Sequence, residues 1–72
     1  MKKVFKLEEL ECANCAAKME DKINKLPEVI FASISFMAST LTIEAEEKDF
    51  ENAVKKAQKV ISKIESDCRI VL

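Results

Sequence analysis

The chain has 72 residues, a hydrophobic fraction of 49%, a charged fraction of 35% and a formal net charge of −1. This length allows one small domain with a thin core, which we assign to residues 1–72, and the composition is typical of a folded chain rather than a disordered one. The nearly balanced charge, with both signs interspersed, argues against the basic face that nucleic-acid binding needs, so we expect no nucleic-acid partner. The chain contains no histidine, so any metal site must use sulfur, carboxylate, backbone oxygen or water.

Targeting signals are missing from the sequence. No stretch approaches the roughly 20 apolar residues that span a bilayer, and the first six residues lack the apolar run of a signal peptide. We therefore expect a cytoplasmic protein. Three cysteines, an odd number, fit a disulfide framework poorly, and in a reducing compartment a close pair is typical of metal binding or redox chemistry.

Hydrophobic periodicity predicts the element order strand, helix, strand, strand, helix, strand. The predicted elements are a strand over 4–10, a helix over 15–26 that Pro27 ends, strands over 29–36 and 40–45, a helix that follows an N-cap at Asp49 and ends at Ser66–Asp67, and a strand over 68–72. This order predicts an α+β fold, the ferredoxin-like βαββαβ arrangement, with two helices on one face of a four-stranded antiparallel sheet.

The predicted topology indicates at which end of the sheet Cys68 and the turn at Met37–Ser39 lie. The last strand of this fold lies antiparallel beside the first, so Cys68 at its start is expected near the loop that follows the first strand. The hairpin turn at Met37–Ser39 is expected at the opposite end of the sheet from that loop.

The segment Glu11-Cys12-Ala13-Asn14-Cys15 carries the chemistry, because two thiols three positions apart at a strand-to-helix turn can bind one soft metal ion. The thiolate is the form that binds metal. Cys15 is expected in the first helical turn, where unpaired N–H groups and the helix dipole stabilise a thiolate, with Cys12 in the preceding loop. Small neighbours leave the pair open, which suits an ion that is handed on, whereas a structural zinc site is closed by four ligands.

Glu11 decides among the metals. Cu(I) is satisfied by two thiolates, and the resulting singly negative complex gains nothing from a carboxylate. Zn(II) or Cd(II) with two thiolates is neutral and takes a carboxylate as a third ligand. We therefore expect Zn(II), Cd(II) or Pb(II) bound by Cys12, Cys15 and Glu11, with Cu(I) as the alternative. Cys68 is either a further thiolate ligand or an ordinary core residue, and Asp67 is a further candidate carboxylate.

With these residues, the chain resembles the heavy-metal-associated domain, the small ferredoxin-like module of copper chaperones and of the cytosolic tails of heavy-metal P-type ATPases. The resemblance covers nearly all 72 residues and rests on the run 10–18, the turn 26–29 and the strand end 34–36. Against the family motif GMxCxxC, Cys12 and Cys15 take the positions of the metal ligands and Leu10 that of a buried methionine. Glu9 stands where glycine is usual, and a positive φ there would strain it.

The acidic residue directly before Cys12 resembles the Zn/Cd/Pb-exporting branch of these ATPases. The resemblance implies a non-enzymatic domain that binds metal in the cytosol, at the cytosolic face of the membrane when tethered. Its partners would be the metal ion and the membrane-embedded and cytosolic domains of the pump, which it supplies or regulates. A free-standing metallochaperone for Zn or Cu(I) is the alternative.

Two further alternatives stay open. We expect a monomer, with a metal-bridged dimer as the alternative. A thiol-disulfide redox protein is disfavoured, because that class places its more reactive thiol first, at the helix N-terminus, whereas here Cys15 is expected closer to the helix.

Overall fold

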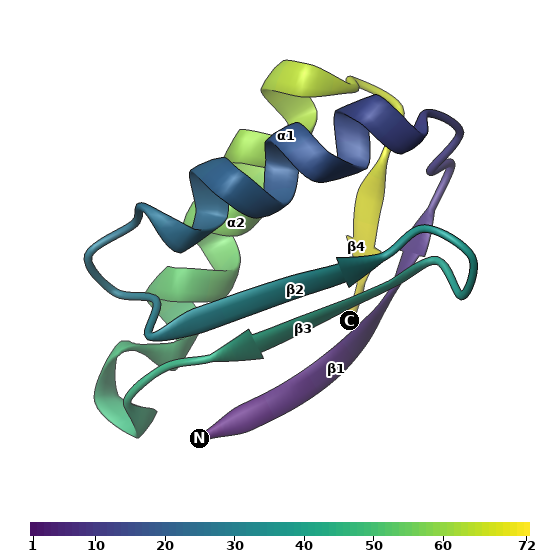
Figure 1. Cartoon of the computed structure of the whole chain (residues 1–72). Helices are drawn as coiled ribbons and strands as arrows, with labels where there is room; N and C mark the ends of the chain where they lie inside the picture. Colours follow the sequence, from purple (N-terminus) through teal and green to yellow (C-terminus); the bar gives the residue numbers. More distant parts are fainter.

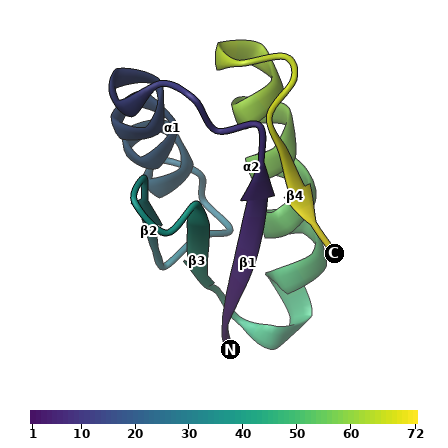
Figure 2. The same ribbon diagram turned by 90° about the vertical axis from the view of Figure 1, so that its right-hand side faces the viewer.

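The structure, a computed structural model, describes residues 1–72 and confirms the predicted order of strands and helices (Figure 1). The elements are β1 (Lys2–Glu8), α1 (Ala13–Asn24), β2 (Phe31–Ser35), β3 (Thr40–Glu44), the 3₁₀ turn η1 (Glu47–Asp49), α2 (Phe50–Ile64) and β4 (Arg69–Val71). The strands form one antiparallel sheet in the order β2-β3-β1-β4. Both helices cover one face of this sheet (Figures 1 and 2), which is the ferredoxin-like arrangement that the sequence predicted.

The first helix begins and ends two residues earlier than the predicted 15–26. The side chain of Cys12 accepts a hydrogen bond from the N–H of Cys15, so the helix is capped at Cys12 and starts at Ala13. At the other end, the residue that precedes Pro27 is disfavoured in the helical region, and Lys25 is the last capping position.

Backbone angles explain two differences from the predicted elements, at the end of β1 and at the start of α2. The first strand ends at Glu8 because Glu9 has φ 61°, a left-handed conformation that no strand accommodates. Asp49 occupies the predicted N-cap position of α2, but its side chain makes no capping hydrogen bond. Its backbone is helical (φ −104°, ψ −2°) because η1 runs directly into α2, whereas a capping side chain needs an extended backbone.

The core lies between the helices and the covered face of the sheet. Its fully buried large side chains come from both layers: Met19, Ile23, Leu41, Ile43, Ile61 and Cys68. On the other face, Val4 is 65% exposed and Phe31 is 48% exposed. The sheet is therefore half-buried, as the alternating strand patterns predicted.

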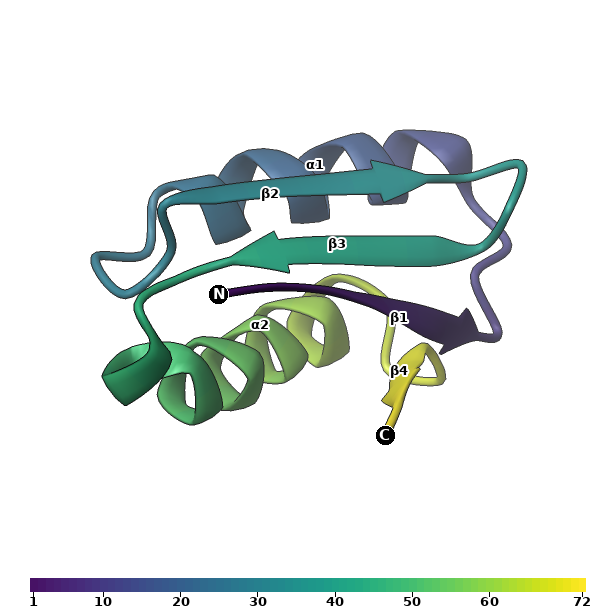
Figure 3. The same cartoon turned by 90° about the horizontal axis from the view of Figure 1, so that it is seen from below.

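Three connections meet at one end of the sheet, as Figures 1 and 3 show. The N–H of Leu7, near the end of β1, donates to the carbonyl of Ser39 in the β2–β3 turn at 2.7 Å. Glu8 pairs with Arg69, so the α2–β4 connection also lies here. The prediction that Met37 lies at the far end of the sheet is wrong. Because α1 returns the chain between them, β1 and β2 both point toward this end, and Met37 follows β2.

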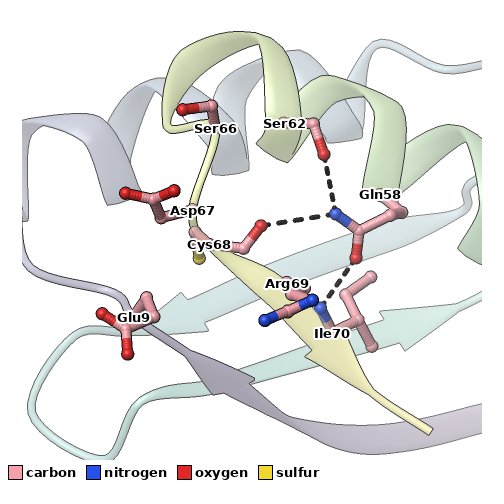
Figure 4. A pocket seen from close by; sticks show the side chains of 8 residues that line it. All are labelled: Glu9, Gln58, Ser62, Ser66, Asp67, Cys68, Arg69 and Ile70. Atoms are coloured by element: carbon pink, nitrogen blue, oxygen red, sulfur yellow. Dashed lines mark hydrogen bonds between the residues drawn. The ribbon is translucent and has the colours of Figure 1, made fainter.

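Side-chain amides from the two helices bind the two edge strands. The Asn24 amide accepts from the N–H of Ala32 and donates to its carbonyl, both at 2.8 Å. Gln58 accepts from the N–H of Ile70 at 2.7 Å and donates to the carbonyl of Cys68 at 3.4 Å (Figure 4). Each amide thus makes the hydrogen bonds that a neighbouring strand would make to the backbone of an edge strand, and it joins a helix to the sheet.

Candidate metal centre

The thiol pair is built by the start of α1. Cys12 has an extended backbone (φ −124°, ψ 115°), and its Sγ accepts a hydrogen bond from the N–H of Cys15 at 3.2 Å. Cys12 therefore fills the N-cap position that oxygen side chains usually occupy, and Cys15 lies in the first turn above it. Both thiols are free and half-buried.

The two thiols have opposite acidities. Hydrogen bonds from the side chain and then the backbone of Cys15 lower the pKa of Cys12, because both stabilise its thiolate. The hydrogen bond with Cys12, followed by burial, raises the pKa of Cys15 to about 11. The prediction that the helix start favours a thiolate at Cys15 is therefore wrong. The N–H group involved is that of Cys15 itself, and it points back to Cys12.

This result also removes the sequence argument against a redox protein. The more acidic thiol is the first of the pair and lies at the helix N-terminus. That order is the one expected of a thiol-disulfide oxidoreductase. The choice between the two classes must rest on the whole fold and its relatives.

Cys12 and Cys15 line one open pocket of about 310 Å³. Its walls come from the β1–α1 loop, the start of α1 and the α2–β4 connection: Glu9, Glu11, Cys12, Cys15, Glu65, Ser66 and Asp67. The predicted group Cys12, Cys15 and Glu11 is thus brought to one pocket, together with Asp67. No three Cys, Asp or Glu side chains converge closely enough to hold a metal ion without moving.

Glu65 is the pocket residue that the sequence reasoning missed. It follows α2, and its carboxylate Oε2 accepts a hydrogen bond from the N–H of Glu11 at 3.4 Å. The topological argument that placed Cys68 near the β1–α1 loop applies equally to the residues just before Cys68. Extending that argument from position 68 back to 65 would have found it.

Cys68 lies in the core rather than in the thiol pocket. It is 1% exposed and belongs to the main apolar cluster. Burial, and then the charge of Glu65, raise its pKa. It lines a neighbouring pocket of about 630 Å³ that contains neither Cys12 nor Cys15 (Figure 4). The structure therefore brings Cys68 to this end of the sheet but not into contact with the pair's pocket.

The loop before the pair turns at the position where the family motif has glycine. Leu10 is partly buried and packs against the core, as predicted for a residue beneath the metal loop. Glu9, in the usual glycine position, has φ 61°. The loop thus keeps the left-handed backbone for which glycine is suited, at the conformational cost that a side chain imposes.

The family model of the heavy-metal-associated domain matches residues 4–68. The chain belongs to this family. Heavy-metal-associated domains and the metallochaperones that share their fold are non-catalytic metal-binding modules, in agreement with the expectation that this chain has no enzymatic activity.

Relatives of this heavy-metal-associated domain include pump domains and chaperones. The chain is 31% identical over 65 residues to a cadmium, zinc and cobalt-transporting ATPase of Bacillus subtilis, covering 90% of the chain and 9% of the ATPase. The N-terminal domain of a potential copper-translocating P-type ATPase of Bacillus subtilis, solved in the Cu(I)-loaded state, is 29% identical (TM-score 0.73, 96% of this chain and 84% of that one). The CopZ metallochaperone is 17% identical (TM-score 0.73, 99% and 100%) and shares the fold.

The domain thus binds heavy metal and spans only a small part of its ATPase relative. Neither of its α-helices combines the length and the hydropathy that crossing a bilayer requires.

Proposed function

We propose that this domain binds one Zn(II), Cd(II) or Pb(II) ion through Cys12, Cys15 and Glu11, and that it delivers the ion to, or regulates, a heavy-metal-exporting P-type ATPase. One observation carries the proposal: Glu11 lines the same pocket as both thiols. A carboxylate beside two sulfurs is a mixed donor set, which borderline divalent ions use and soft Cu(I) does not.

The charge of the pocket supports the same choice. Two thiolates neutralise a divalent ion, whereas Cu(I) with two thiolates keeps a negative charge. Besides the thiols, the pocket is lined by four carboxylates and one serine, namely Glu9, Glu11, Glu65, Asp67 and Ser66. The neutral Zn(II) bis-thiolate can therefore accept a neighbouring carboxylate as a further ligand, whereas the Cu(I) bis-thiolate is already negative and is repelled by the surrounding carboxylates.

The proposed role in transport follows from the openness of the site. Two half-buried thiols in an open pocket leave room for an incoming ligand, so an ion can be exchanged between proteins. The relative's name, a cadmium, zinc and cobalt-transporting ATPase, supports a pump as the partner. We propose the cytoplasmic side of the membrane as the location. We propose that the domain acts there as a monomer.

The ligand assignment is tested by titrating the reduced protein with Cd(II) and following thiolate-to-metal charge-transfer absorption. We expect saturation at one equivalent and loss of the signal in Cys12→Ser and in Cys15→Ser. Cys68→Ser is the matched control, and it should keep the signal unless Cys68 is recruited as a further thiolate. An unchanged titration in both Cys12→Ser and Cys15→Ser would contradict the proposal.

The metal preference is tested by competition of Zn(II) and Cu(I) against chelators of known affinity. Glu11→Gln should weaken Zn(II) binding by about tenfold or more and leave Cu(I) binding unchanged. Glu47→Gln removes the same charge from the exposed η1 turn and serves as the control. Equal weakening of both ions by Glu11→Gln would refute the role of the carboxylate.

Cu(I) delivery is the second candidate function, and a specific observation favours it. No three acidic or thiol side chains converge on one point, whereas two thiols suffice for Cu(I). This second function replaces the first if two results are obtained together. The wild-type protein would prefer Cu(I) over Zn(II) by more than a simple two-thiolate ligand does, and Glu11→Gln would change the affinity for neither ion.

A further inference from the structure

The N-terminal half of β1 has a free side. Strand β4 pairs with β1 only from Lys6 to Glu8, so it lies beside the C-terminal part of β1 alone (Figure 2). On the other side, β3 pairs with β1 from Lys2 to Lys6. The segment from Lys2 to Val4 therefore has a neighbouring strand on one side only, and we call its free side the open edge.

The register of the ladder shows which backbone groups lie at the open edge. The N–H of Leu7 donates to the carbonyl of Ser39, on the side of β3. Because the direction of bonding alternates along an antiparallel strand, odd-numbered residues of β1 bond toward β3 and even-numbered residues face the opposite side. The N–H and C=O groups of Lys2 and Val4 therefore point to the open edge, where no strand receives them.

The outer edges of the sheet are closed by side chains, unlike the open edge. The Asn24 amide bonds both the N–H and the carbonyl of Ala32 on β2. The Gln58 amide bonds the N–H of Ile70 on β4. No side-chain amide takes this role on β1, and unpaired strand backbone is a template for pairing with another chain. The open edge is therefore the place where this sheet accepts a further strand.

An apolar groove lies beside the open edge, against α2. Two adjoining cavities of about 430 and 370 Å³ form it, and both are lined by Val54, Lys55 and Leu72. Phe5 and Phe50 line the larger cavity, and their rings stack with centroids 6.1 Å apart. Successive side chains of a strand point to opposite faces of its sheet, so every second side chain of a strand added at the open edge points into this groove.

The charge around the groove is positive. Lys3, Lys55 and Lys59 line the two cavities. The only carboxylate in the lining is that of Glu51. None of these residues is in an ion pair. The excess of positive charge favours an acidic partner.

The lysines also disfavour a second copy of this chain as the occupant. Two copies paired antiparallel through their open edges would bring Lys3 directly opposite Lys3 of the other copy, and like charges at opposed positions destabilise a strand pair. On the open face of the sheet, Lys2 and Lys6 flank Val4. Glu44, across from Lys2 on β3, offsets only part of this charge.

We propose that the open edge and the groove form a docking site for an extended segment of a partner protein, in which apolar residues alternate with acidic ones. The segment adds a strand beside Lys2–Val4 and pairs with the free backbone groups there. Its apolar side chains enter the groove over Phe5 and Phe50, and its carboxylates meet the lysines of the open face. This site lies at the N-terminal end of β1, whereas the thiol loop follows Glu8 at the other end, so it is independent of the proposed metal binding.

Nuclear magnetic resonance tests the site with the isotope-labelled chain and a synthetic peptide of about eight residues in which valine alternates with glutamate. The amide signals of Lys2–Phe5 should shift on titration. The N–H groups of Lys2 and Val4 should exchange rapidly with solvent in the free protein and become protected when the peptide binds. The N–H groups of Ala32 and Ile70, at the closed edges, should keep their exchange rates. A peptide with lysine in place of glutamate is the control and should not bind.

Two pairs of variants locate the binding. Val4→Pro removes the N–H at the open edge, where strands tolerate proline, and it should abolish peptide binding. Val4→Ala keeps this N–H and should bind within about fivefold of wild type. Lys55→Glu reverses a charge in the groove and should weaken binding by about tenfold. Lys63→Glu makes the same change at an exposed position of α2 outside the groove and should have little effect.

Four results would overturn the proposal: no shifts at Lys2–Phe5, equal binding of the lysine peptide, wild-type binding by Val4→Pro, or equal effects of Lys55→Glu and Lys63→Glu. Protection of Val4 that rises with protein concentration in the absence of peptide would also overturn it, because a second copy then fills the edge. The lysine variants alter exposed side chains of α2 and decide the question even if Val4→Pro unfolds. The Cd(II) titration of Lys55→Glu should match that of wild type, so the docking site and the proposed function fail independently.

Discussion

The Sγ of Cys12 lies 3.2 Å from the backbone nitrogen of Cys15 and accepts its hydrogen bond, so the first thiol of the pair is also the cap of α1. One atom therefore serves both the fold and the site. Because the cap holds its sulfur at the helix N-terminus, Cys12 is the more acidic thiol and Cys15 keeps its proton at neutral pH.

Metal affinity should depend on pH in a way set by this difference. Cys15 has a pKa of about 11, so it is protonated in the free protein and must release its proton when the metal binds. Above the lowered pKa of Cys12, only that one proton is released, and the logarithm of the apparent Cd(II) affinity should rise by about one per pH unit. Below it, both thiols lose protons, and the slope should approach about two. Competition titrations at a series of pH values measure the slope, and a pH-independent affinity would show that the thiols are not the ligands.

Glu9→Gly should stabilise the protein. A non-glycine residue at φ 61° costs roughly 1–2 kcal/mol, and the greater entropy of glycine in the unfolded chain offsets part of the gain, which leaves about 0.5–1 kcal/mol. Urea unfolding measures the change. Glu9→Ala removes the same charge but keeps the side-chain clash, so it should give no gain. Glu8→Gly, in the regular strand β1, should destabilise, and a loss in Glu9→Gly as well would contradict the strain argument.

The amides that bind the edge strands should matter for stability. Gln58→Ala leaves the N–H of Ile70 without its acceptor, and Asn24→Ala does the same to Ala32. Each should lower the free energy of unfolding by about 1–3 kcal/mol, the cost of an unsatisfied buried donor. Asn52→Ala, on an exposed position of α2, is the control and should not destabilise the protein, because alanine is the better helix former. Urea unfolding measures the stability of the three variants. If Gln58→Ala and Asn24→Ala were as stable as Asn52→Ala, water would be replacing the hydrogen bonds of the amides.

The Glu28–Lys56 ion pair joins the α1–β2 connection to α2. The hydrogen bond from Lys56 lowers the pKa of Glu28, so the pair contributes stability above the unfolded pKa of this carboxyl and loses it as the pH falls through the folded pKa. Glu28→Gln should therefore destabilise the protein at neutral pH, and only slightly, because Lys56 is 45% exposed and water screens the pair.

At strongly acidic pH, the difference in unfolding free energy between wild type and Glu28→Gln should disappear, because the wild-type carboxyl is then protonated. Asp21→Asn is the control, since its pair with Lys25 is 68% and 74% exposed and should contribute almost nothing. A Glu28→Gln deficit that is the same at neutral and acidic pH would assign the effect to packing instead of charge.

Local sequence patterns were sufficient to predict much of the metal site. The spacing of Cys12 and Cys15, the carboxylate of Glu11 beside them and the apolar periods of the helices are all short-range features, and they predicted the order of elements and the location of the thiols. The same short range limits precision at boundaries. Whether Glu9 leaves the strand, or whether a thiol caps a helix, depends on backbone angles that residue types alone do not specify.

What the sequence by itself determined, then, is the βαββαβ order and the thiol pair at the first strand-to-helix turn, because both are encoded within a few neighbouring residues. The tertiary structure alone decided that Glu65 reaches Glu11, that Met37 lies at the same end as the thiols, and that Cys68 is buried in the core. These relationships join residues far apart in the chain. They depend on the direction of every strand and on how the helices pack on the sheet, and no local period carries that information.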